Sequence, residues 1–139
     1  MQTRSKLYLL LPVVLACSGT DITSTDVKPQ FAVMCSPPRA TIPNLVAVTR
    51  AKNSDFTANF TVKNNCGVKL TLTLTASRTG AITRINARSP QSMILPSGTS
   101  QAASVSYHTG SPGTGTVVLT ATTSRGVPSW GSQTVTVTN

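Results

Sequence analysis

The sequence predicts an all-β protein: one antiparallel β-sandwich of about seven strands. Apolar and polar residues alternate in several short runs, and turn residues separate these runs roughly every 8 to 12 positions. Threonine and serine dominate the polar positions, which favours strands over helices. The chain contains no sustained apolar pattern at the i, i+3, i+4 spacing, so no amphipathic helix is expected.

The strands are expected wherever this period of two is visible. Residues 56–63 show it most clearly, because two phenylalanines, an alanine and a valine alternate with threonine, asparagine and lysine. The turn at 64–67 follows, and alternation resumes over 68–76 with Val68 as its first inward residue. Weaker or shorter strands are expected at 45–48, 81–88, 103–107, 117–121 and 134–138, with a turn at 95–98 and a glycine-rich loop at 110–115.

Residues 1–16 are predicted to be a secretory signal peptide. Arg4 and Lys6 precede an apolar run that extends from Leu7 to Ala16. A helix of this length spans roughly 15 Å, whereas a bilayer core is about 30 Å thick, so the run is too short for a transmembrane helix. A buried N-terminal strand is the alternative, but nothing in the run alternates. A basic region followed by a short apolar region is typical of export.

Cys17 is predicted to be a lipid anchor. The run Val14-Leu15-Ala16-Cys17 resembles a bacterial lipobox, in which the cysteine after a small residue receives diacylglycerol. The resemblance implies a cell-envelope protein that is anchored by its lipid to the outer membrane, on the periplasmic or the surface face. Residues 17–34 are then expected to be a polar tether between the membrane and the domain. Ordinary signal-peptidase cleavage after Ser18 is the alternative, and it would remove Cys17.

Cys35 and Cys66 are predicted to form a disulfide. The chain has three cysteines, and both lipidation and removal of Cys17 leave this even pair. Closing a loop of about 30 residues stabilises a fold by roughly 3 to 4 kcal/mol in the chain-entropy model. A zinc site is the alternative, but zinc takes four ligands and the domain offers only these two thiols and His108. We therefore expect no metal and no cofactor.

Three runs carry a resemblance to a known type of domain. FTVKNNCGVKLTLTLTASRTG, ILPSGTSQAASVSYHTGSPGTGTVVLTATTS and SQTVTVTN look like the Ig-like domains that are repeated in bacterial surface proteins. The resemblance extends over residues 40–139 and implies an Ig-like β-sandwich from 35 to 139. It implies an architecture and no activity, so the expected function is a non-enzymatic binding or structural module of the envelope. A weaker similarity to fimbrial pilins, through Cys35 and Cys66, implies instead a subunit that assembles by strand exchange.

Residues for catalysis are scarce. Asp55 is the last acidic residue of the chain, so catalysis by paired carboxylates is not expected beyond it. His108 and Asp55 could join one of many serines in a triad, but no G-x-S-x-G run supports this, and His108 continues the outward register of Ser104 and Ser106. We expect no enzyme activity.

The positive charge indicates candidate ligand-binding residues. The formal net charge is +9, and Arg84 and Arg88 are expected on one face of the 81–88 strand. Such cations attract an acidic polysaccharide, the phosphates of lipopolysaccharide or an envelope protein, whereas the lack of interleaved aromatic residues disfavours nucleic acid as a ligand. Arg125 and Trp130 lie in a predicted loop, 125–131. An exposed Trp130 would bind a partner or a sugar, as in a carbohydrate-binding module, but we expect it to fold back over the end of the sandwich.

Overall fold

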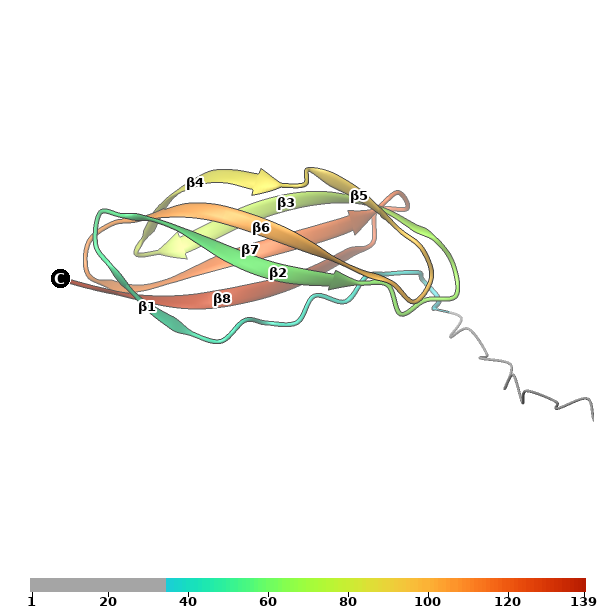
Figure 1. Cartoon of the computed structure of the whole chain (residues 1–139), viewed down its shortest axis with the longest axis horizontal. Coiled ribbons are helices and arrows are strands. Elements are labelled where there is room, and N and C mark those ends of the chain that lie inside the picture. The colour runs from blue at the N-terminus through green and yellow to red at the C-terminus, as the bar shows by residue number, and fades with distance from the viewer. Residues whose placement is uncertain (1–34) are drawn as a thin grey trace, which may run out of the picture. The chain divides into compact units, whose positions relative to one another are not determined.

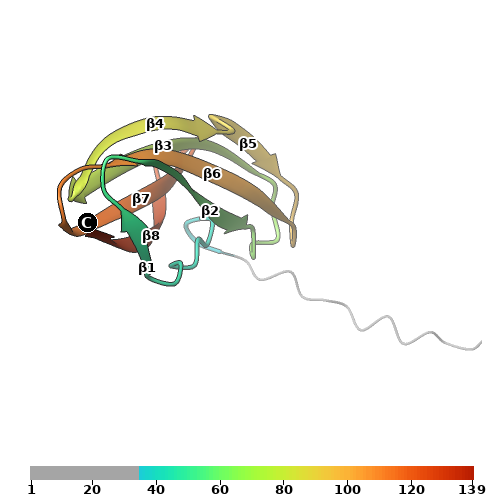
Figure 2. The ribbon, with the colours of Figure 1, turned by 60° about the vertical axis from the view of Figure 1, so that its left-hand side comes forward.

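The computed structural model describes residues 35–139, which form two β-sheets packed face to face (Figures 1 and 2). One sheet has five strands in the order β1-β8-β7-β3-β5, and the other has three in the order β2-β6-β4. The predicted signal peptide (1–16), Cys17 and the tether (17–34) lie outside the described residues. The strands are β1 Val48–Ala51, β2 Asp55–Lys63, β3 Leu70–Gly80, β4 Ile82–Ser89, β5 Ser92–Leu95, β6 Ser100–Thr109, β7 Gly113–Thr123 and β8 Pro128–Thr138.

The core lies between the two sheets and is built from the alternate residues of each strand, as the period of two predicts. Leu72 and Leu74 of β3 face Phe60 and Tyr107 of the other sheet, and all four are fully buried or nearly so. The rings of Phe56 and Tyr107 lie 6.2 Å apart across the β2–β6 pair. The prediction of an all-β sandwich is therefore confirmed.

The number of strands exceeds the predicted seven because β5 was missed. This strand has only four residues and lies at the edge of the larger sheet, where it pairs with β3. Its two inward residues, Met93 and Leu95, complete the core at that edge. A four-residue segment of this kind shows too few alternations to be distinguished from a loop by sequence pattern.

The prediction for the last strand was also too short, since β8 begins at Pro128 and not at 134. Its first half carries Gly131 and Gln133 at inward positions, so it lacks the apolar period that the prediction relied on. A glycine is required at position 131 because Ile42 packs closely against it. A Cβ atom at this position would lie 2.5 Å from Cγ2 of Ile42 and 2.9 Å from the carbonyl oxygen of Ile42.

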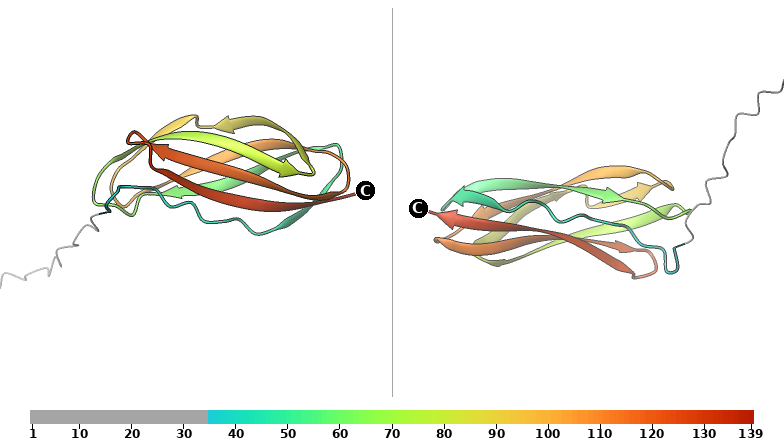
Figure 3. Two further views of the ribbon diagram at one scale, coloured as in Figure 1. Left: turned by 180° about the vertical axis from the view of Figure 1, so that it is seen from behind. Right: turned by 90° about the horizontal axis from the view of Figure 1, so that it is seen from below.

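The sandwich is not purely antiparallel, because β1 runs parallel to β8 (Figure 3). The segment before β1 already follows β8: the Leu45 amide donates to the Ser132 carbonyl, and the side chain of Gln133 donates to the Val46 carbonyl. Residues 45–51, which include β1, therefore cover the edge of β8 that does not pair with β7.

Candidate binding surface at the disulfide end

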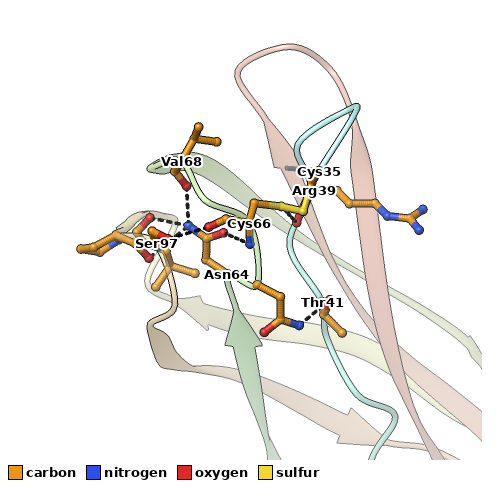
Figure 4. The surroundings of a disulfide bond; sticks show 10 residues. Cys35, Arg39, Thr41, Asn64, Cys66, Val68 and Ser97 are labelled. Carbon is orange, nitrogen blue, oxygen red and sulfur yellow. Dashed lines mark hydrogen bonds between the residues drawn. A yellow bond between two sulfur atoms is a disulfide. The ribbon is translucent and has the colours of Figure 1, made fainter. Parts of the chain in front are cut away.

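The predicted disulfide is confirmed. Cys35 and Cys66 are bonded, with their Cα atoms 5.3 Å apart and 31 positions apart in sequence. Cys66 is buried in the turn between β2 and β3, and its Sγ atom lies 3.3 Å from the carbonyl oxygen of Arg39 (Figure 4). The bond fixes the start of the domain to this turn. A disulfide is typical of exported proteins, because it persists in oxidising compartments.

Asn64 organises the same turn from the inside. Its side chain is fully buried, and its amide nitrogen donates to the carbonyl oxygens of Val68, Leu95 and Pro96 at 2.8, 2.9 and 3.0 Å. Its side-chain oxygen accepts from the Cys66 amide at 2.9 Å (Figure 4). From the sequence alone, Asn64 was interpreted only as a turn residue. Its side-chain role could have been predicted, because the side-chain oxygen of an asparagine can accept a hydrogen bond from the backbone amide two residues later in a turn.

We call the surface around this turn the disulfide end. It comprises residues 35–42, the β2–β3 turn, the β7–β8 tip at 124–127 and the first residues of β8. One pocket of about 250 Å³ lies between Arg39, Ile42 and Trp130. A second, of about 320 Å³, lies between Val68, Lys69 and Arg125 and is also lined by the hydroxyl-bearing residues Thr71, Thr123 and Ser124. Val68 is 43% exposed here, so the prediction that it faces the core was wrong.

Trp130 projects into solvent, contrary to the expectation that it folds back over the sandwich. It belongs to β8, opposite Thr120 of β7, and its side chain is 66% exposed. Its neighbours Ser129 and Gly131 take the inward positions of the strand. Because the side-chain period of a strand is two, Trp130 must therefore point outward.

Arg84 and Arg88 do not share a face, contrary to expectation. Two register irregularities interrupt β4, one between Ile82 and Arg84 and one between Ile85 and Ala87. Arg84 consequently lies opposite the outward His108, whereas Arg88 lies opposite a buried residue, Val105. The Nε atom of Arg88 donates to the Leu74 carbonyl in the other sheet at 2.7 Å. Neither arginine belongs to the disulfide end, whereas Arg125 and Trp130 both do.

The cations of residues 35–139 fall into two groups. Five have a partner: Lys52 donates to Asn139, Arg78 to the Ile82 carbonyl, Arg84 to Asn86 and Arg88 to the Leu74 carbonyl, and Arg50 lies over the Phe56 ring. The other four are exposed, and their side chains have no hydrogen bond or ion pair within the described part of the chain. They are Arg39, Lys63, Lys69 and Arg125, and all four lie at or beside the disulfide end.

Asp55, the single acid among residues 35–139, lies at the opposite end of the sandwich. Its Oδ1 atom is 2.8 Å from Nδ1 of His108 and accepts from the side-chain amide of Asn86 at 2.7 Å. These two hydrogen bonds, that of His108 first, hold the pKa of Asp55 below its ordinary value of 3.8. The neighbouring Ser106 hydroxyl is hydrogen-bonded to Thr57, and within residues 35–139 no serine hydroxyl is hydrogen-bonded to Asp55 or His108.

The Asp55 pair gives a pH prediction. A carboxylate with a lowered pKa stabilises the folded state above its unfolded pKa, and this contribution is lost as the pH falls through the folded pKa. The carboxylate is exposed, so the effect on stability is small and decreases with salt. In an NMR titration, the Asp55 carboxyl should titrate below 3.8, and His108→Gln should move its midpoint upward. An unchanged midpoint in this variant would contradict the assigned cause.

Other kinds of site are not apparent in the described part of the chain. Within residues 35–139, no three histidine, cysteine or acidic side chains gather as metal ligands. The same residues form no helix that is long and apolar enough to cross a membrane.

Comparison with solved structures identifies the type of fold. No protein-family model and no curated protein matches the sequence. Among solved structures, the chain is similar to the PapD-like domain 7 of human CEP192, with 13% identity and a TM-score of 0.53 over 84% of this chain and 96% of that one. It is also similar to the CARDB domain of PF1109 from Pyrococcus furiosus, with 13% identity and a TM-score of 0.54 over 73% and 89%. The fold is an Ig-like β-sandwich.

A third similarity is to a part of a larger protein. The secreted serine protease VesC of Vibrio cholerae matches with 22% identity and a TM-score of 0.50, over 68% of this chain. The match covers only 21% of VesC, so this chain spans about a fifth of its length. At these identities the similarities show the fold alone.

Proposed function

We propose that the protein is an exported, non-enzymatic binding module, anchored to the cell envelope by a lipid on Cys17. The observation that carries the proposal is the disulfide end. Four cations that have no partner among residues 35–139 and an exposed tryptophan lie there, at the end where Cys35 begins the domain. Unpaired cations and exposed aromatic rings are the groups that bind partners, whereas the other cations are held by the protein itself.

The absence of catalysis is part of the proposal. The one acid–base pair of residues 35–139, Asp55 with His108, has no described serine hydrogen-bonded to it. The pair instead connects β2 to β6 and, through Asn86, to β4. We assign it to the structure of the smaller sheet.

Lipid anchoring is tested by metabolic labelling. When the full chain is expressed in a bacterial host with a radioactive fatty acid, the wild-type protein should carry the label and the Cys17→Ser variant should not. After a wash at about 1 M salt, which screens electrostatic docking, the wild-type protein should also remain with the membrane fraction and the variant should not. An unlabelled wild-type protein, or a label that persists in Cys17→Ser, would refute the anchor.

Binding of an acidic polysaccharide is a second candidate function. The pocket beside Trp130 favours it, because an aromatic face can stack on a sugar ring and the Arg39 guanidinium in the same pocket can pair with a carboxylate. Assembly by strand exchange has no such support. The edge of β8 is paired with the chain's own residues 45–51, although β1 and β5 of the larger sheet and β2 and β4 of the smaller sheet are edge strands.

A further inference from the structure

The four cations that have no partner among residues 35–139 lie at one end of the sandwich. Arg39 borders the pocket of Trp130, and Lys69 and Arg125 border the second pocket. Lys63, the last residue of β2, pairs with Thr41, which lines the pocket of Trp130. The guanidinium of Arg39 extends away from the disulfide (Figure 4). Among residues 35–139, no acidic residue lies at this end, because Asp55, the single acid of that range, is at the start of β2 and Lys63 is at its end. The charged side chains that residues 35–139 contribute to the disulfide end are therefore all positive.

The same surface exposes apolar side chains. Trp130 is 66% exposed and Val68 is 43% exposed, one in each pocket. Cations combined with an exposed tryptophan are the chemistry of a bilayer interface, since the ring buries its apolar body at headgroup level while its N–H stays hydrated. A soluble polyanion would account for the cations but would not account for Val68.

Residues 1–34, which precede the described domain, join it at the disulfide end. The disulfide holds Cys35 against the β2–β3 turn, so residues 1–34 enter at the disulfide end and not at the end that carries Asp55. A membrane attachment at Cys17 lies 18 positions before Cys35, a span of at most about 65 Å when fully extended. The attachment therefore brings this end of the domain within reach of the bilayer.

We propose that the disulfide end docks on an anionic phospholipid bilayer. Arg39, Lys63, Lys69 and Arg125 bind headgroup phosphates, and Trp130 and Val68 enter the interfacial layer. The inference deepens the proposed function by naming the partner of the same surface. It also predicts the orientation of the domain on its anchor, with the Asp55 end directed away from the membrane.

Vesicle binding tests the proposal without the lipid. The mature chain from position 17, carrying Cys17→Ser, is sedimented with vesicles of phosphatidylcholine that contain about a third phosphatidylglycerol, at about 0.1 M salt. It should bind these vesicles and not pure phosphatidylcholine. The variant Lys69→Gln with Arg125→Gln should lose about 30-fold in partition coefficient, as two cations at the surface of an anionic membrane imply.

The matched control is Lys52→Gln with Arg84→Gln. It removes the same charge from the Asp55 end, a strand length of about 35 Å away and several Debye lengths from a docked bilayer. This control should lose less than about threefold. Equal losses in the two variants would mean that only net charge matters, and would overturn docking through this end.

A binding measurement on an acidic polysaccharide distinguishes a bilayer ligand from a polysaccharide ligand. The same chain is applied to immobilised polygalacturonate, a carboxylated polysaccharide, at the same salt. Binding to polygalacturonate without binding to the anionic vesicles overturns the bilayer proposal in favour of the polysaccharide. Failure on both supports also overturns it. Because these chains carry Cys17→Ser, none of these outcomes bears on the anchor, which fatty-acid labelling tests separately.

Discussion

Replacing Asn64 by alanine should lower the free energy of unfolding by about 2 to 4 kcal/mol. The side chain is fully buried and makes four hydrogen bonds to the backbone. Alanine would leave the Cys66 amide without its acceptor and would deprive the Val68, Leu95 and Pro96 carbonyls of a donor. A buried backbone group without a partner costs about 1 to 3 kcal/mol, and not all of these groups can reach water.

Asn65 provides the matched control for this prediction. It is the neighbouring asparagine in the same turn, but it is exposed and makes a single hydrogen bond, 3.4 Å long, to the Thr41 hydroxyl. Asn65→Ala should change the free energy of unfolding by less than about 0.5 kcal/mol. Urea denaturation of both variants measures the difference. Similar values for the two would contradict the role that we assign to Asn64.

Loss of the disulfide should destabilise the domain by roughly 3 to 4 kcal/mol, because the bond closes a loop of about 30 residues in the unfolded chain. The double variant Cys35→Ala with Cys66→Ala tests this without burying a hydroxyl at position 66. The denaturation midpoint should fall to nearly the same value in this variant and in the reduced wild-type protein. Oxidised and reduced protein with equal midpoints would show that the bond does not contribute to stability.

The effect of the disulfide should also be local. The bond holds residues 35–42 in place, and the Thr41 and Lys63 amides exchange hydrogen bonds with each other's carbonyls on that segment. Hydrogen exchange of these two amides should therefore accelerate on reduction more than exchange within β7. Because Asn64 accepts from the Cys66 amide, the Asn64 and cysteine substitutions should not be additive.

The sequence predicted the parts of the fold that follow a simple period. The alternation over 56–63 became β2 almost residue for residue, since each apolar side chain there contacts the other sheet. The first half of β8 was missed because Gly131 stands where an apolar residue would show the pattern, and its small size is explained only by Ile42, which approaches from far away in the sequence.

The candidate site was only partly visible in the sequence. Trp130 and Arg125 were predicted in one loop, 125–131, but Trp130 belongs to β8 and the two residues line different pockets. The exposure of Trp130 follows from its outward position on that strand, which the sequence pattern did not indicate. Arg84 and Arg88 were wrongly joined, because irregularities in β4 change which face a residue takes and leave no mark in the residue types. Arg39 was missed. Its importance appears only when every other cation is matched with its partner.

The emission of Trp130 tests the central claim most directly, because it is the only tryptophan of the chain. The mature Cys17→Ser protein is mixed with anionic vesicles, with and without bromine on the upper acyl chain of the lipid. Docking through the disulfide end predicts a blue shift of the emission and strong quenching by the brominated lipid, both absent with pure phosphatidylcholine. Binding to the vesicles with unshifted, unquenched emission would contradict the account, since the domain would then meet the bilayer through another surface.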